Sequence, residues 1–217
     1  MKLIHNFKSP NYNERKSKCI DIIVIHYTAL NSVSKSLKHL CNKKNKVSSH
    51  YLISQQGQIY SLVSEKKRAW HAGQSYWRGN TDINSISIGI ELDFSPSDIN
   101  NKFTSKLNFA LIFLLKKLLK KYRISNENIL GHSDIAPYRK KDPGKYFPWQ
   151  MLENKKLSYR PQFLNRVDIK NNLKKEWLNK NKLNSKKKKI LFMLNFIGYD
   201  TSLALKNKIY FDQLINA

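Results

Sequence analysis

The stretch DIIVIHYT (residues 21–28) decides the fold of this chain. Its unbroken β-branched run, residues 22–25, does not alternate between apolar and polar side chains, which is typical of a strand buried on both faces. LNFALIFLLKKLLKKY (107–122) is apolar nearly all round in its first half, so this helix is expected to pack on the sheet. These two elements predict an α/β (mixed α+β) protein with a central mixed β-sheet flanked by helices.

Apolar alternation and turn residues place the other elements of this domain. A hairpin is expected in SSHYLISQQGQIYSLV (48–63), with its turn at Gln56-Gly57, and a strand in SISIGIEL (85–92). Thr104 is expected to cap the long helix. A helix is predicted at 34–44 and a short strand at 128–130. Loops are predicted at 1–19 and 68–80.

The composition changes after Trp149. Residues 155–189 carry 13 Lys and Arg against two acidic residues. We therefore predict a main domain over residues 1–160 and a basic helical C-terminal region over 161–217. One helix of that region is expected in ILFMLNFIGYD (190–200), with Gly198 as its C-terminal cap.

The chain is strongly basic, with 40 Lys and Arg against 15 Asp and Glu and a formal net charge of +25. Such a charge favours polyanionic surroundings, such as nucleic acid, an anionic membrane face or an acidic cell-wall polymer. A Lys- and Asn-rich composition bias without a dedicated partner is the alternative. No nucleic-acid-binding motif is present, so specific binding to DNA or RNA is not expected.

Several targeting and redox signals are absent from the sequence. The first 18 residues lack the apolar run of a secretory signal, which predicts a cytoplasmic protein; export to the periplasm or envelope by a non-standard route is the alternative. The longest uncharged apolar stretch, 107–115, is far short of the roughly 20 residues that span a bilayer. Cys19 and Cys41 form no CxxC pair and are interpreted as packed thiols.

The loop GHSDIAPYRKKDPG (131–144) is dense in ionisable side chains and follows an apolar pair, which indicates a site rather than a surface connection. His132 and Asp142 are interpreted as two ligands of a catalytic zinc, and His26, at the end of a buried strand, as the third. Two histidines and a carboxylate are a standard hydrolytic zinc set. A purely structural role for each single histidine is the alternative. No HExxH helix is present, which excludes the helical metalloprotease arrangement.

Five motifs together carry a resemblance to a known family. In order and spacing they resemble the zinc-dependent N-acetylmuramoyl-L-alanine amidases of the AmpD/AmiD type, over about residues 20–150. Peptidoglycan recognition proteins and amidase-type phage lysozymes share this fold. The motifs are VIHYT, SSHYLI, AWHAG, SIGIEL and GHSDIAPYRKKDPG.

The resemblance implies one Zn²⁺ per chain, bound by His26, His132 and Asp142, and it places Glu91 and Lys140 at the catalytic positions. An apolar strand lies behind Glu91, and burial would raise its pKa towards that of a general base. Lys140 would stabilise the oxyanion of the tetrahedral intermediate. The alternatives are an ion-paired carboxylate at a strand end and a solvated lysine.

Four further residues are interpreted as substrate-binding. His50 and His71 occupy matching motifs and would line the cleft or orient metal ligands. Trp70 would stack on a sugar or peptide face, or be buried. Arg139 is suited to a substrate carboxylate.

By resemblance, the domain over residues 1–160 hydrolyses the amide between N-acetylmuramic acid, possibly in its 1,6-anhydro form, and L-alanine in peptidoglycan or muropeptides. A monomer with electrostatic contact to an anionic wall or membrane surface is expected. IGYD (197–200) resembles the peptidoglycan-binding modules fused to such enzymes; a plain helical extension is the alternative. The alternative function is a non-catalytic peptidoglycan receptor of the same fold.

Overall fold

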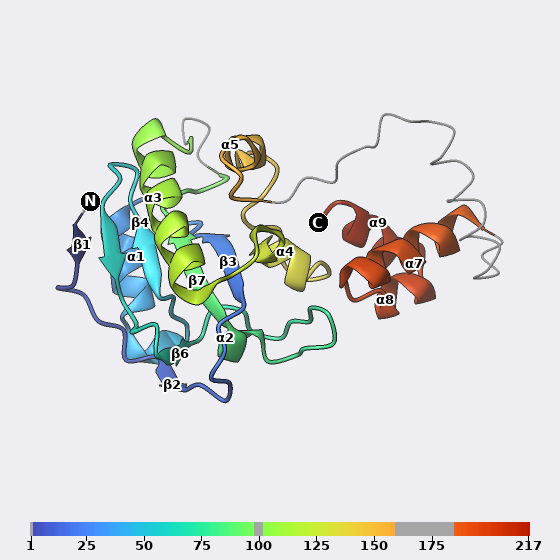
Figure 1. Ribbon diagram of the computed structural model, residues 1–217, viewed down its shortest axis with the longest axis horizontal. Coiled ribbons are helices and arrows are strands. Elements are labelled where there is room, and N and C mark those ends of the chain that lie inside the picture. Colours follow the sequence, from blue (N-terminus) through green and yellow to red (C-terminus); the bar gives the residue numbers. More distant parts are fainter. Residues whose placement is uncertain (1, 98–101, 159–184) are drawn as a thin grey trace.

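The computed structural model describes residues 2–97, 102–158 and 185–217, and its centre is a six-stranded mixed sheet (Figure 1). The strand order is β1-β5-β4-β7-β3-β8, and every neighbouring pair is parallel except the β4–β5 hairpin. The hairpin and the mixed sheet confirm the predicted fold class. The strands are β1 (Leu3–Ile4), β3 (Ile22–Tyr27), β4 (Tyr51–Ile53), β5 (Ile59–Ser61), β7 (Ser87–Leu92) and β8 (Ile129–Gly131).

Helix α3 (Ser105–Tyr122) covers one face of this sheet (Figure 1). Its apolar residues share a core with side chains of β3 and β7, including Ile23 and Ile90. The Thr104 hydroxyl accepts a hydrogen bond from the Leu107 amide at 3.2 Å, which is the predicted N-terminal cap. Burial against the sheet, rather than helix propensity alone, therefore fixes this helix.

The opposite face is shared between a helix and a polar cluster. Helix α1 (Val33–Leu40) packs there on Leu52 of β4. Next to it, Val24 of β3 packs on Trp77 and Ile83 from the long segment after β6 (Lys67–Ala69). Successive side chains of a strand point to opposite faces, so His26 lies on the same face of the sheet as Val24. It stands where this apolar cluster ends.

Some predicted boundaries were wrong because short backbone pairings leave no periodic signal in the sequence. The N-terminal residues form two short strands instead of a loop: β1, and β2 (Tyr12–Glu14), which pairs with β6 (Lys67–Ala69) in a two-stranded sheet. A helical turn, α2 (Ile83–Ile86), takes up the start of the predicted strand at 85–92. The charged loop begins with another, α4 (His132–Ile135).

The other helices are short. The helix predicted at 34–44 ends at Leu40, and the 3-10 helix η1 (Lys43–Asn45) follows it. A second 3-10 helix, η2 (Asn126–Asn128), precedes β8. Helix α5 (Trp149–Asn154) follows the charged loop. No helix among the described residues is long and apolar enough to cross a membrane. Cys19 is exposed and Cys41 half-buried, so the interpretation as packed thiols fails for Cys19.

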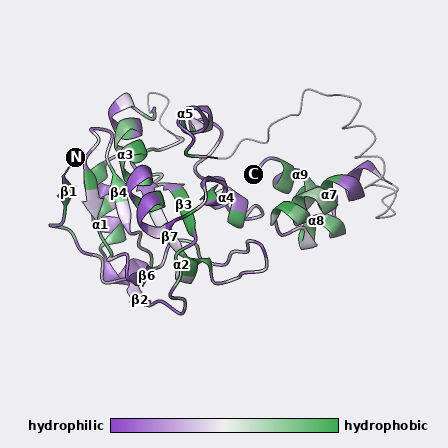
Figure 2. Ribbon diagram, viewed as in Figure 1, coloured by the Kyte–Doolittle hydropathy of each residue, from purple (hydrophilic) through white to green (hydrophobic). Residues whose placement is uncertain are grey.

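Three helices form the described C-terminal part: α7 (Lys186–Ile197), α8 (Ser202–Lys206) and α9 (Lys208–Ile215). They enclose a small core of Leu191, Ala204 and Leu214, and Figure 2 shows their hydrophobic stretches after the hydrophilic first turn of α7. Gly198 ends α7, as predicted. The predicted domain boundary at 160/161 lies outside the described residues.

Candidate metal centre

Three side chains from separate segments converge at the carboxyl ends of the central strands. The Nδ1 atoms of His26 and His132 are 2.9 Å apart, and each lies 3.0 Å from Oδ2 of Asp142. All three residues are buried. His26 belongs to β3, and His132 directly follows β8, which pairs with β3. This cluster, whose geometry could hold a metal ion, contains the three residues that the sequence predicted.

Hydrogen bonding assigns the proton of the His132 ring to Nε2. That nitrogen lies 3.0 Å from the carbonyl oxygen of Ala72, which can only accept. Because a neutral imidazole carries one ring proton, Nδ1 of His132 presents a bare lone pair to the centre.

A chain of three hydrogen bonds makes the same assignment for His26. The Ser87 hydroxyl donates to the carbonyl of Ile83 at 2.6 Å, so it accepts from Nε2 of His71, 3.1 Å away. Nδ1 of His71 is then free to accept from Nε2 of His26, also 3.1 Å away. The remaining nitrogen, Nδ1 of His26, faces the centre as a second lone pair.

Burial keeps the rings of His26 and His71 neutral. It lowers the pKa of His26 to about 4, with a further contribution from His132, and lowers the pKa of His71 well below 6.5. In this assignment neither Nδ1 has a proton to donate to Oδ2 of Asp142, which lies 3.0 Å from both nitrogens. Two neutral lone pairs and an ionised carboxylate repel one another, so the centre is suited to a cation.

Glu91 stands beside the centre because β3 and β7 run parallel with His26 opposite Glu91. It is 9 % exposed, and its Oε2 has no hydrogen-bond partner within the described ranges. Burial raises its pKa to about 8; Asp142 adds to this effect and Lys140 opposes it. A carboxyl group in this environment can hold a proton near neutral pH.

A cavity of about 220 Å³ joins these groups, and it is lined by both predicted catalytic residues, Glu91 and Lys140, as well as the three centre residues. The imidazole ring of His71, which hydrogen-bonds to His26, also lines this cavity. The residues predicted from separate motifs are therefore brought to one cavity.

His50 lies deeper than the sequence suggested. It is fully buried; its Nδ1 accepts from the Gly89 amide at 3.0 Å, and its Nε2 lies 2.9 Å from Nη2 of Arg15. No atom of this ring is left to contact a substrate, so the alternative role of supporting other residues fits it better. Gly89 is required beside it, because a Cβ there would lie 2.4 Å from Cγ of His71.

Sequence reasoning missed Arg15 and Ser87. Arg15 donates to four backbone carbonyls around His50. Neither residue stands out in a single sequence, since both act through segments far away along the chain. Gly89 did offer a signal, because a glycine inside a strand marks a close approach.

The other two predicted substrate-binding residues already have protein partners. Nη2 of Arg139 donates to the carbonyls of Ala72 and Gln74 at 2.8 and 2.7 Å. Trp70 donates from its indole nitrogen to Oδ1 of Asn13 at 3.0 Å. Substrate contact by Arg139 and Trp70 stays a prediction.

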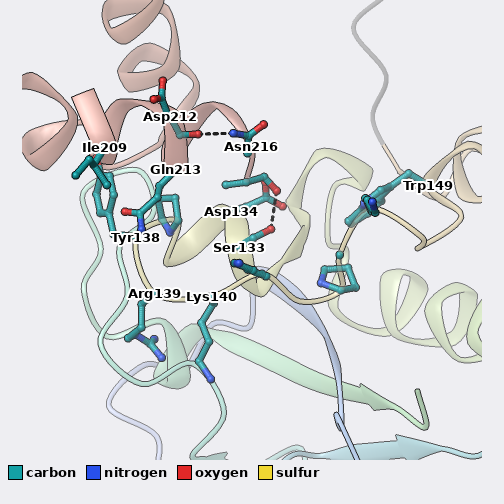
Figure 3. A pocket seen from close by; sticks show the side chains of 16 residues that line it. Ser133, Asp134, Tyr138, Arg139, Lys140, Trp149, Ile209, Asp212, Gln213 and Asn216 are labelled. Atoms are coloured by element: carbon teal, nitrogen blue, oxygen red, sulfur yellow. Dashed lines mark hydrogen bonds between the residues drawn. The ribbon is translucent and has the colours of Figure 1, made fainter. Parts of the chain in front are cut away.

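Arg139 and Lys140 also border a second cavity of about 850 Å³ between the charged loop and α9. Figure 3 shows both side chains extending from the loop on the side away from α9. On the α9 side, the Ser133 hydroxyl donates to the carbonyl of Ala217 at 2.7 Å. The C-terminal helices therefore form one wall of a cavity next to the centre.

Comparisons with known proteins relate the chain to one protein family. Residues 15–145 match the protein family described as N-acetylmuramoyl-L-alanine amidase. The chain is 42 % identical over 155 residues to the N-acetylmuramoyl-L-alanine amidase AmiD of Escherichia coli (strain K12). That match covers 61 % of this chain and 52 % of AmiD, so the chain matches about half the length of this relative.

Two solved structures have the same fold. One is the complex of E. coli AmiD with the substrate anhydro-N-acetylmuramic acid-L-Ala-D-γ-Glu-L-Lys, with a TM-score of 0.69 and 32 % identity, covering 88 % of this chain and 80 % of that one. The other is AMPDH3 from Pseudomonas aeruginosa in complex with anhydromuramic pentapeptide, with a TM-score of 0.72 and 28 % identity, covering 96 % and 86 %.

Proposed function

Because the chain belongs to the N-acetylmuramoyl-L-alanine amidase family, we propose that it hydrolyses the amide between the lactyl group of N-acetylmuramic acid and L-alanine, with one zinc ion per chain at His26, His132 and Asp142. The activity of the whole protein is inferred from relatives such as AmiD, of which the match covers 52 %.

The observation that carries this proposal is the convergence of two unprotonated nitrogens and a carboxylate oxygen. Three atoms about 3 Å apart lie about 1.7 Å from the centre of their triangle, which is within the zinc–ligand bond length of about 2.0–2.1 Å. The donor set, two imidazoles and one carboxylate, is one that hydrolytic zinc uses with a fourth position left open. Without a cation, the three groups would repel one another.

Zinc held there supplies Lewis acidity, which polarises the scissile carbonyl and makes water easier to deprotonate. Glu91 accepts a proton from the attacking water and passes it to the leaving nitrogen of L-alanine. The pKa of about 8 belongs to the metal-free protein; a zinc ion beside Glu91 would lower it, so that the carboxylate can accept and return a proton near neutral pH. Lys140, which lines the same cavity, places its ammonium group near the oxyanion that forms on the lactyl carbonyl.

We propose a soluble 1,6-anhydro-muropeptide as the preferred substrate. The support comes from AmiD and AMPDH3, whose solved complexes contain anhydro-muramic peptides. Carboxylates of such a stem peptide would pair with Arg139, Lys140 and Lys141, which line the cavity between the charged loop and α9.

The experiment measures peptide release by mass spectrometry from anhydro-N-acetylmuramyl-tripeptide and from intact sacculi. The parent chain, stripped of metal and reloaded with one equivalent of zinc, is compared with Glu91→Gln. Asp21→Asn, an exposed carboxylate just before β3, is the matched control. We expect Glu91→Gln to lower kcat by at least about 100-fold, the usual size of a general acid–base contribution.

Full kcat in Glu91→Gln would contradict the role of Glu91, and release by the metal-free parent would contradict the role of zinc. Binding of the muropeptide without any release would favour a peptidoglycan receptor instead. Faster release from sacculi than from the soluble substrate would overturn the proposed preference.

A further inference from the structure

The IGYD segment (residues 197–200) lies against the helical turn that carries His132. The Tyr199 hydroxyl donates to Oδ1 of Asp134 at 2.5 Å. The other oxygen of the same carboxylate, Oδ2, accepts from the backbone amide of Gly131 at 2.6 Å. Gly131 is the residue directly before His132 and the N-cap of α4. One carboxylate therefore joins the C-terminal helices to the backbone that positions a residue of the metal centre.

Packing against neighbouring residues fixes the position of the Tyr199 ring. It packs edge-on against the Trp77 indole with a centroid distance of 5.0 Å. Gly198 before it has a φ of +139°, and a Cβ there would lie 2.5 Å from Cγ of Arg78 and 3.2 Å from Cε2 of Trp77. The Arg78 amide donates to the Gly198 carbonyl at 3.0 Å. This close approach explains a glycine before the tyrosine.

A second hydroxyl joins the same two parts at a different place. The Tyr138 hydroxyl donates to the carbonyl of Asp200 at 2.6 Å and accepts from the amide of Ala204 at 3.3 Å. Tyr138 lies outside α4, and its hydroxyl donates to the Asp200 carbonyl rather than to Asp134. It provides a comparison of the same chemistry, a tyrosine hydroxyl joining the C-terminal helices to the charged loop, without the link to the metal centre.

We propose that Tyr199 is a positioning residue for the metal centre, acting through Asp134 and the Gly131 amide on His132. The inference rests on the proposed function, since it takes His132 as a zinc ligand. Helix α4 has only four residues, too few to be stable by its own hydrogen bonds. The carboxylate of Asp134 caps it, and the Tyr199 hydroxyl fixes the orientation of that carboxylate. The C-terminal region thereby becomes part of what sets zinc affinity.

The alternative is that the C-terminal helices only add stability. Tyr199→Phe tests this, because it keeps the ring against Trp77 and removes only the hydroxyl. Tyr138→Phe is the matched control. Two quantities are measured on the full chain: the zinc dissociation constant, by competition with a chromophoric chelator, and amide hydrogen exchange of the peptide that spans residues 130–136 in the metal-free protein.

We expect Tyr199→Phe to weaken zinc binding about tenfold, the lower end of what is usual when a residue that orients a metal ligand is removed. Exchange in 130–136 should be faster in the same variant. Tyr138→Phe should change neither quantity by more than about twofold, although both variants should lose thermal stability. Asp134→Asn, which weakens the same cap from its other side, should reproduce both effects and serves as the second variant if Tyr199→Phe does not fold.

Equal zinc affinities in the parent and Tyr199→Phe, or equal losses in the two Phe variants, would overturn the positioning role while leaving the amidase proposal intact. Zinc binding absent from the parent would instead refute the proposed function. In that case, unchanged exchange in 130–136 would still overturn the positioning of α4 by Tyr199, and faster exchange would support it.

Discussion

The buried carboxyl group of Glu91 should make the metal-free protein less stable as the pH rises. Burial raises the pKa of Glu91 from 4.5, its value in the unfolded chain, to about 8 in the folded protein. Between these values the folded chain keeps a proton that the unfolded chain has lost, so stability falls with rising pH. At about 1.4 kcal/mol per pH unit, the ionised form destabilises the folded protein by about 5 kcal/mol above pH 8.

Glu91→Gln removes this dependence, because glutamine does not titrate. Urea unfolding with a chelator present, at pH values from 5 to 8.5, measures the free energy of unfolding of the variant and the parent. A buried amide has its own cost, but this cost is the same at every pH. The difference between the two proteins should therefore grow by several kcal/mol in favour of the variant as the pH rises.

Asp21→Asn, which changes an exposed carboxylate, serves as the control and should follow the parent at every pH. Parallel profiles for the parent and Glu91→Gln between pH 5 and 8.5 would refute the reasoning, because they would show that Glu91 is not held protonated in the folded protein.

Three further substitutions test the residues that support the centre and the cap of helix α3. Gly89→Ala should displace the His71 ring and lower the free energy of unfolding, measured in urea, by about 1–3 kcal/mol. Zinc affinity should fall as well. An unchanged zinc affinity would show that His71 does not orient His26. Arg15→Ala should lower the free energy of unfolding by about 2–3 kcal/mol, because a half-buried guanidinium no longer donates to four backbone carbonyls, and a change below about 0.5 kcal/mol would contradict this. Thr104→Ala should lower it by about 1 kcal/mol through loss of the helix cap and leave zinc binding unchanged.

The parts of the fold that the sequence predicted are those with local causes. The buried strand around Val24 and the long helix α3 follow from apolar patterns within a dozen residues. The short strands β1 and β2 were missed because their hydrogen bonds go to β5 and β6, more than 50 residues away, and leave no local pattern. Pairing at a sheet edge depends on the tertiary structure.

The candidate site divides in the same way. His26, His132 and Asp142 could be predicted because each lies in a motif of distinctive composition, and the structure brings them together. The groups that set their protonation could not. The carbonyl of Ala72 and the Ser87 hydroxyl look ordinary in a sequence, and they matter only because folding places them against imidazole nitrogens.

The same limit applies to the C-terminal region. Its helices and the cap at Gly198 were predicted from local signals. The contact between Tyr199 and Asp134 joins residues 65 positions apart and was not anticipated. A contact of this kind becomes visible only when both partners are placed in three dimensions.

The most direct test of the account is an equilibrium zinc titration of the metal-stripped parent chain beside Asp142→Ala. The convergence of two unprotonated nitrogens and one carboxylate predicts one zinc per parent chain, and loss of this binding in Asp142→Ala with the fold retained by circular dichroism. A parent chain that binds no zinc, or an Asp142→Ala variant that binds it with the parent's affinity, would contradict the assignment of the centre.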